Sequence, residues 1–149
     1  MIPMAAAAAA GVNTHTGAVN VAKAPLNSFS FDLNNAPDLF PIAAVLAAFC
    51  PGESRIAGTG RLAGKESDRA KSILDMLTQM GVECAVEGDE MVIHGHSLTS
   101  RLLNGNLLKG GAYTPSHDHR MVMALKVAGL GADSPVLIDD EACVAKSFP

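Results

Sequence analysis

Apolar residues recur along this chain with two different spacings, which separate predicted strands from predicted helices. Alternating polar and apolar residues, or short apolar segments, predict strands near 18–22, 28–33, 54–57, 82–87, 90–94 and 134–138. The segments 82–87 and 90–94 flank Gly88 and Asp89, a pair typical of tight turns. They are therefore predicted to form a β-hairpin.

Helical spacing of apolar residues predicts helices over 39–49, 70–80 and 121–130. The first segment is apolar on every side, which predicts a buried helix with Asp38 as its N-cap. Gly81 is placed to end the second helix, and Asp118 to cap the third. Residues 58–64 are predicted to form a glycine-rich loop, and 97–115 an irregular connection.

The same order of strands and helices appears twice along the chain. The second copy is expected to end in a helix that begins at Lys146 and stops at Pro149. The sequence therefore predicts an α/β (α+β) fold built from repeated βαβαββ units, with the second unit incomplete. The notable polar clusters all fall where helices are predicted to begin, so they could converge on one anion-binding pocket.

Composition narrows the class of protein. The chain has 149 residues, of which 48% are hydrophobic and 17% charged, enough for one globular core. A net charge of −4, no Trp and one Tyr argue against a nucleic-acid partner. No apolar segment is long enough to span a bilayer. Cys50, Cys84 and Cys143 are odd in number and widely spaced, so we expect reduced core thiols in a cytoplasmic protein with no membrane partner.

The stretch 65–69 holds two cations and two carboxylates directly before a predicted helix. Free backbone N–H groups at such a helix start, together with Lys65 and Arg69, would suit an anion. Glu66 would then lie beside that anion as a proton donor. The alternative is an ordinary solvated helix start, with Arg69 on the surface.

The histidines suggest a metal site only weakly. His94 and His96 are expected to be exposed residues at the end of a strand, because no third ligand has a suitable spacing. His117 and His119 are two positions apart, so they cannot share one face of a helix. The sequence therefore predicts no metal site.

Four motifs in order resemble those of the 5-enolpyruvylshikimate-3-phosphate (EPSP) synthase family. They are Pro37-Asp38, Lys65-Glu66-Ser67-Asp68-Arg69, Asp118-His119-Arg120 and Lys146-Ser147-Phe148-Pro149. The resemblance covers 31–149, which would be a partial C-terminal domain of that family. It leaves 1–30 as an unassigned leader with a low-complexity start.

The resemblance implies an enzyme that transfers the enolpyruvyl group of phosphoenolpyruvate to the 5-hydroxyl of shikimate 3-phosphate, releasing phosphate without metal or cofactor. It implies catalytic roles for Asp38, as base or orienting carboxylate, and Glu66, which handles the proton on the methylene carbon. It also implies substrate-binding roles for these residues: Arg69, Arg120 and Lys146 on phosphoenolpyruvate, with Lys65 and His119 lining the same pocket. The family's N-terminal domain would be the missing partner.

Three interpretations follow from the sequence. The first is an enzyme fragment that is inactive alone. The second is a stand-alone module that binds anions without catalysis. The third is a domain in which the charged helix starts are merely caps. Binding of phosphate analogues would separate the first two from the third.

Overall fold

The chain is a mixed α/β protein, as predicted. The computed structural model describes residues 9–12, 17, 19–63, 68–115, 117–139 and 141–146. Lys65 and Glu66 lie outside the described residues, and of Lys146 only the backbone is described. No helix formed by the described residues is long and apolar enough to cross a membrane.

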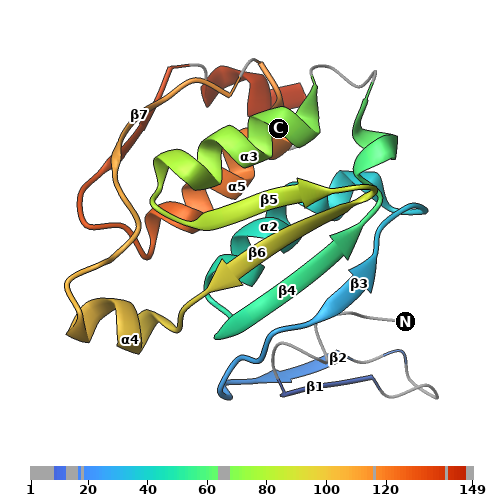
Figure 1. Cartoon of the computed structure of the whole chain (residues 1–149). Helices are drawn as coiled ribbons and strands as arrows, with labels where there is room; N and C mark the ends of the chain where they lie inside the picture. Colours follow the sequence, from blue (N-terminus) through green and yellow to red (C-terminus); the bar gives the residue numbers. More distant parts are fainter. Residues whose placement is uncertain are drawn as a thin grey trace.

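A four-stranded sheet forms the centre of the fold, in the order β3-β4-β6-β5 (Figure 1). Its strands are β3 (Ser30–Asp32), β4 (Gly52–Ala57), β5 (Glu83–Glu87) and β6 (Glu90–Gly95). Strands β3 and β4 are parallel, and the other neighbours are antiparallel. The predicted hairpin of β5 and β6 is confirmed, and Gly88 in its turn has a φ of +61°, a conformation that favours glycine.

Two smaller strand pairs complete the described sheets. One is an antiparallel hairpin of β1 (Ala9–Val12) and β2 (Val19–Ala22). The other is a parallel pair, β7 (Gly111–Tyr113) and β8 (Val136–Ile138). Strand β7 lies inside the segment that the sequence predicted to be irregular, so that prediction is wrong there. Three residues carry too little local signal, and β7 exists because β8 provides its backbone partners.

Helices α2 (Phe40–Ala48), α3 (Arg69–Gln79) and α5 (His119–Gly129) lie together on one side of the central sheet (Figure 1). Helix α2 contacts strands β4 and β6 on one side and helices α3 and α5 on others. This explains its sequence, because a helix surrounded by protein has no need of a polar face. The core contains Phe40, Ile56, Leu77, Ile93 and Leu125, all at most 1% exposed.

Four short helices also occur among the described residues: η1 (Pro37–Leu39), η2 (Thr59–Leu62), α4 (Leu98–Leu103) and η3 (Glu141–Lys146). Of these, η2 and α4 replace parts of the predicted loops. Helix α4 begins because the Ser97 side chain accepts a hydrogen bond from the Ser100 backbone N–H, 3.1 Å away. The predicted loops over 58–64 and 97–115 are therefore wrong in part.

The predicted start of a helix at Lys146 is also wrong, because Lys146 is the last residue of η3. The physical reason is tertiary packing: Cys143 is buried and η3 contacts α5, which fixes a helical turn earlier in the chain than expected. The prediction of core thiols holds for Cys50 and Cys143, which are buried, whereas Cys84 is only half-buried. Burial raises the pKa of the Cys50 thiol to about 11.

The end of β6 packs directly on the end of α2, at Gly95. A Cβ atom on Gly95 would collide with the carbonyl oxygens of Ala47 and Cys50. We expect Gly95→Ala to lower the free energy of unfolding by about 2 kcal/mol or more, because backbone must move to make room. Urea unfolding monitored by circular dichroism measures this loss.

Gly129→Ala is the matched control, because a Cβ there would meet Val136 at 3.4 Å, an ordinary contact. Gly129 lies at the end of α5, where alanine is a better helix former than glycine. The control should keep or raise stability. If the two substitutions had equal effects, the close approach of β6 to α2 would be incorrect.

Candidate functional site

Asp38 does not cap α2, contrary to the prediction. The N-cap position belongs to Leu39, which makes no side-chain capping hydrogen bond, because the chain enters α2 through the turn η1 that contains Asp38. The Asp38 carboxylate instead faces two arginines. Its Oδ1 accepts a hydrogen bond from Arg69 Nη1 at 2.9 Å, and its Oδ2 lies 3.2 Å from Arg120 Nη2.

Arg69 is the first residue of α3, so this helix begins at the end of the stretch 65–69. Asp68 is its N-cap and accepts a hydrogen bond from the Lys71 backbone N–H at 3.2 Å. The Arg69 side chain turns inward and is almost fully buried, with 2% exposed. It is therefore not the surface residue of an ordinary solvated helix start.

Asp118 is the buried partner of Arg69. Arg69 Nε donates to Asp118 Oδ2 at 2.7 Å, and Arg69 Nη2 donates to Asp118 Oδ1 at 3.3 Å. Asp118 Oδ1 also accepts a hydrogen bond from the Arg120 backbone N–H at 3.0 Å, which confirms the predicted cap of α5. One carboxylate, 0% exposed, thus joins the starts of α3 and α5.

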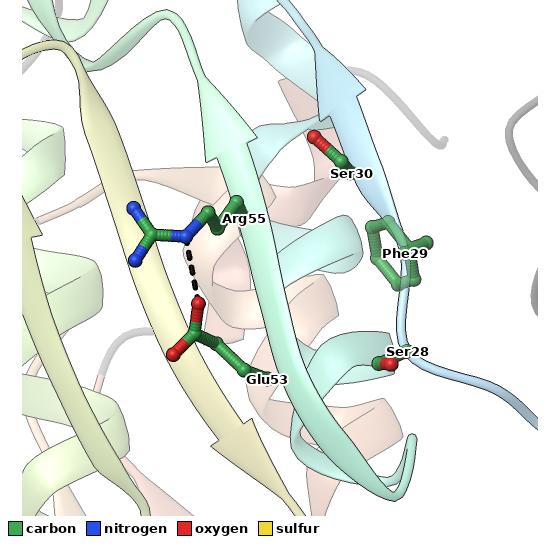
Figure 2. A pocket seen from close by; sticks show the side chains of 5 residues that line it. All are labelled: Ser28, Phe29, Ser30, Glu53 and Arg55. Carbon is green, nitrogen blue, oxygen red and sulfur yellow. Dashed lines mark hydrogen bonds and ion pairs between the residues drawn. The ribbon is translucent and has the colours of Figure 1, made fainter.

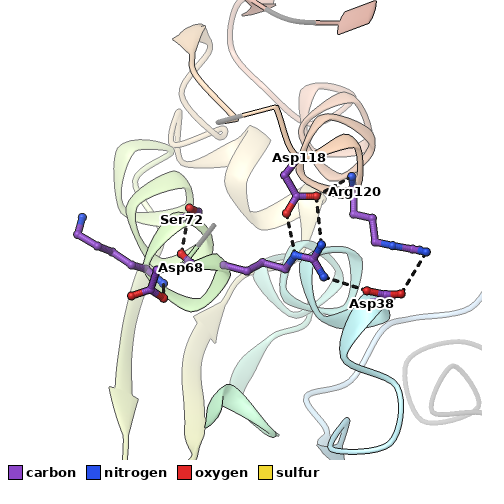
Figure 3. Close-up of polar contacts among 7 residues, drawn as sticks. Asp38, Asp68, Ser72, Asp118 and Arg120 are labelled. Carbon is purple, nitrogen blue, oxygen red and sulfur yellow. Dashed lines mark hydrogen bonds and ion pairs between the residues drawn. The ribbon is translucent and has the colours of Figure 1, made fainter. Parts of the chain in front are cut away.

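These contacts form a continuous chain of ion pairs, which we call the arginine–aspartate cluster: Asp118, Arg69, Asp38 and Arg120 (Figure 3). The cluster contains two positive and two negative groups. Its inner half is buried, whereas the side chains of Asp38 and Arg120 are 47% and 36% exposed. An incoming anion can therefore reach the Asp38 end of the cluster.

Electrostatics hold the inner arginine in its charged form. Burial by itself lowers the pKa of the Arg69 guanidinium, because it penalises the charged form. Hydrogen bonds to Asp118 and then to Asp38 outweigh this effect, so the pKa of Arg69 is raised above its usual value. A charge that is fixed and partly dehydrated interacts more strongly with an anion than a solvated one.

His119 is the first residue of α5 and lies between Asp118 and Arg120 in sequence. Both of its ring nitrogens are buried, and neither has a hydrogen-bond partner among the described residues. Buried polar groups normally have partners, so a bound ligand is one way to satisfy this ring. The structure thus brings Asp38, Arg69, His119 and Arg120 to neighbouring helix starts, while Lys65, Glu66 and the Lys146 side chain are not described.

Sequence reasoning identified Asp118 as a cap but missed its ion pair with Arg69. An aspartate before a helix is explained by capping alone, and its partner lies 49 residues away. Nothing in the local sequence indicated the second role. The reverse error was made at Asp38, where the position before a helix suggested a cap that the structure does not form.

Other candidate sites are weaker. No group of three or more possible metal ligands occurs among the described His, Cys, Asp and Glu residues. A hollow of about 250 Å³ lies beside β3 and β4 and is lined by Ser28, Phe29, Ser30, Glu53 and Arg55 (Figure 2). Arg55 there is bound by Glu53, Glu87 and Glu90, so its charge is more than neutralised. This hollow shares no residue with the arginine–aspartate cluster and does not suit an anion.

The fold and the cluster define a mixed α/β protein with a charged site at the starts of its helices. Comparison with known proteins identifies the family, because the model of EPSP synthase (3-phosphoshikimate 1-carboxyvinyltransferase) matches residues 2–149. The chain belongs to the EPSP synthase family. The match begins well before Phe31, so it also includes most of the segment that the sequence left unassigned.

Individual relatives agree with the family model. A 3-phosphoshikimate 1-carboxyvinyltransferase of Methanocorpusculum labreanum is 41% identical over 94% of this chain and 31% of the relative. One from Aeropyrum pernix is 42% identical over 84% of this chain and 27% of the relative. The structure of EPSP synthase from Acinetobacter baumannii superposes with a TM-score of 0.73 at 27% identity, covering 88% of this chain and 30% of that one. The chain thus spans about a third or less of these relatives.

Proposed function

We propose that this chain contributes part of the active site of an enzyme that transfers the enolpyruvyl group of phosphoenolpyruvate to the 5-hydroxyl of shikimate 3-phosphate, releasing phosphate. The observation that carries the proposal is the Asp38 carboxylate held between the guanidinium groups of Arg69 and Arg120. Two guanidinium groups that bind one carboxylate side by side can bind a carboxylate or phosphate of a substrate in the same way. Membership of the EPSP synthase family supports phosphoenolpyruvate and shikimate 3-phosphate as the substrates of this proposal.

In this proposal, binding of phosphoenolpyruvate displaces Asp38 from the arginines. The substrate's acidic groups take its place on Arg69 and Arg120, with Lys146 and Lys65 adding positive charge. The freed Asp38 carboxylate then accepts the proton of the 5-hydroxyl as that oxygen attacks the enol carbon. His119, whose buried nitrogens lack partners among the described residues, supplies a hydrogen bond in the same pocket.

The proton balance requires a second acid. Glu66 gives its proton to the methylene carbon, which becomes a methyl group while the new carbon–oxygen bond forms. A base then removes a proton from that methyl group as the carbon–oxygen bond to phosphate breaks, restoring the enol double bond and releasing phosphate. The proposed reaction involves no net oxidation or reduction and uses no metal or cofactor. We also propose a cytoplasmic location for it.

The second candidate is a stand-alone module that binds anions without catalysis. Its supporting observation is that the described arginines can bind an anion whether or not a second substrate is present. Both candidates predict anion binding. Only the first predicts that, in a longer enzyme that binds both substrates, replacing Asp38 or Glu66 lowers the rate of product formation.

Anion binding is tested by titrating phosphate and phosphoenolpyruvate into the chain and following backbone amide NMR signals. We expect saturable shifts at Asp38, His119 and Arg120. Arg120→Ala should weaken binding about 10-fold or more, because a hydrogen bond between charged groups is lost at the accessible end of the cluster.

Lys126→Ala is the control for this substitution. Lys126 lies on the same helix but in its last turn, so the variant removes the same charge away from the arginine–aspartate cluster. It should change the dissociation constant by less than about 2-fold, the size expected of a solvated and screened charge. Equal effects of the two substitutions would indicate attraction by net charge alone and would contradict the proposed site.

A further inference from the structure

Asp118 has more contacts than a helix cap requires. A cap needs one hydrogen bond to a backbone N–H, which Asp118 makes to Arg120. Its two oxygens also bind Nε and Nη2 of Arg69, in the paired geometry that fixes a planar guanidinium in orientation. The comparable cap of α3, Asp68, is exposed and accepts the Lys71 N–H without contacting the Arg69 guanidinium.

We propose that Asp118 is a positioning residue of the anion site, an inference that rests on the proposed function. It acts through Arg69, and it is fully buried, so it does not itself meet the ligand. By occupying Nε and Nη2, it leaves Nη1 as the nitrogen that points to Asp38. By capping α5, the same carboxylate also fixes the backbone position from which the Arg120 side chain projects.

Two possible effects of Asp118, its negative charge and its positioning of Arg69, predict opposite changes in anion affinity when Asp118 is replaced. Asp118 is negative, so simple Coulomb attraction predicts that removing its charge tightens the binding of an anion. Positioning predicts weaker binding, for two reasons. Arg69 loses the contact that orients it, and its remaining partner among the described residues, Asp38, then holds it more firmly and competes better with an incoming anion. The sign of the change therefore separates the two accounts.

The test compares Asp118→Asn with Asp68→Asn. Asparagine caps helices as well as aspartate does, so both variants keep their caps and lose one negative charge. We expect Asp118→Asn to weaken phosphate binding at least about 5-fold, and Asp68→Asn to change it less than about 2-fold. We also expect the NMR signal of the Arg69 Nε–H to shift and to exchange faster with water in Asp118→Asn only, because its 2.7 Å partner has lost its charge.

A second variant addresses whether Asp118 acts through Arg69. Arg69→Lys keeps the positive charge but cannot bind the carboxylate through two nitrogens. It should weaken phosphate binding about as much as Asp118→Asn does, and combining the two substitutions should weaken it little further. Arg69→Lys also provides the test if the Asp118→Asn chain does not fold, since Asp118 then keeps its charge and its cap.

The outcomes distinguish this inference from the proposed function. Unchanged or tighter phosphate binding in Asp118→Asn would overturn the positioning role alone, whereas unchanged or tighter binding in Arg69→Lys would overturn it and also contradict the proposed contact between Arg69 and the substrate. Additive losses in the double variant would also overturn it, because the two residues would then act independently. If the unsubstituted chain binds neither phosphate nor phosphoenolpyruvate, both the inference and the proposed function are wrong.

Discussion

Replacing Arg69 with alanine is expected to lower the free energy of unfolding by about 3 to 5 kcal/mol, the usual cost of removing one partner from a buried ion pair. The cost is high because Asp118 is 0% exposed and its buried charge would lose the cation that the described residues pair with it. The loss also extends along the cluster, since Asp38 would lose its 2.9 Å contact with Arg69 and keep its 3.2 Å contact with Arg120. That outer contact is half-exposed and adds little to the total.

Urea unfolding of the parent chain and of the Arg69→Ala variant measures this difference in the free energy of unfolding. Lys71→Ala is the matched control, because Lys71 is also a cation on α3 paired with an aspartate, Asp75, but both side chains lie at the surface. Exposed pairs of this kind contribute little to stability, so the control should unfold at nearly the same urea concentration as the parent chain. Similar losses in both variants would mean that the burial of Arg69 is not what makes its ion pairs important.

The elements that the sequence predicted well are those specified by neighbouring residues. The β5–β6 hairpin follows from two alternating segments and the turn at Gly88. The cap of α5 at Asp118 follows from one acidic residue before a helical pattern. Helix α3 ends at Gln79 with Met80 as its C-cap, and Gly81 follows at a φ of +82°, as predicted for the residue that ends this helix. In each case the deciding interactions lie within a few residues.

The parts that could not be predicted depend on residues far apart in the chain. Strand β7 forms on β8, and η3 forms on α5. The arginine–aspartate cluster joins Asp38 to Arg69 across 31 residues, and Arg69 to Asp118 across 49. The sequence resemblance selected charged helix starts, and the structure brings three of the predicted site residues, Asp38, Arg69 and Arg120, into direct contact. It could not show that their charges are already paired with one another.

That internal pairing leads to the expectation that this chain alone releases no measurable phosphate from phosphoenolpyruvate and shikimate 3-phosphate. Its described arginines near Asp38 are neutralised by Asp38 and Asp118, so two highly charged substrates find little net positive charge there. Asp38 and Arg120 also face solvent, where water weakens every charge interaction in a transition state. Enzymes of this kind of chemistry usually exclude water by closing around their substrates.

The measurement is a coupled assay of phosphate release, with the full-length 3-phosphoshikimate 1-carboxyvinyltransferase of Methanocorpusculum labreanum, of which the match covers 31%, as the positive control. The chain alone should stay at the level of the enzyme-free blank while still binding phosphoenolpyruvate. Release above that blank would contradict the expectation only if Asp38→Asn abolished it, since a contaminating phosphatase would be indifferent to that substitution. In the longer enzyme, the same substitution at the matching aspartate should slow turnover by a factor of ~100 or more, the scale of losing a positioned base. Binding without turnover in the short chain, together with turnover that depends on this aspartate in the long one, would support substrate binding by Arg69 and Arg120 and the role of a base for Asp38.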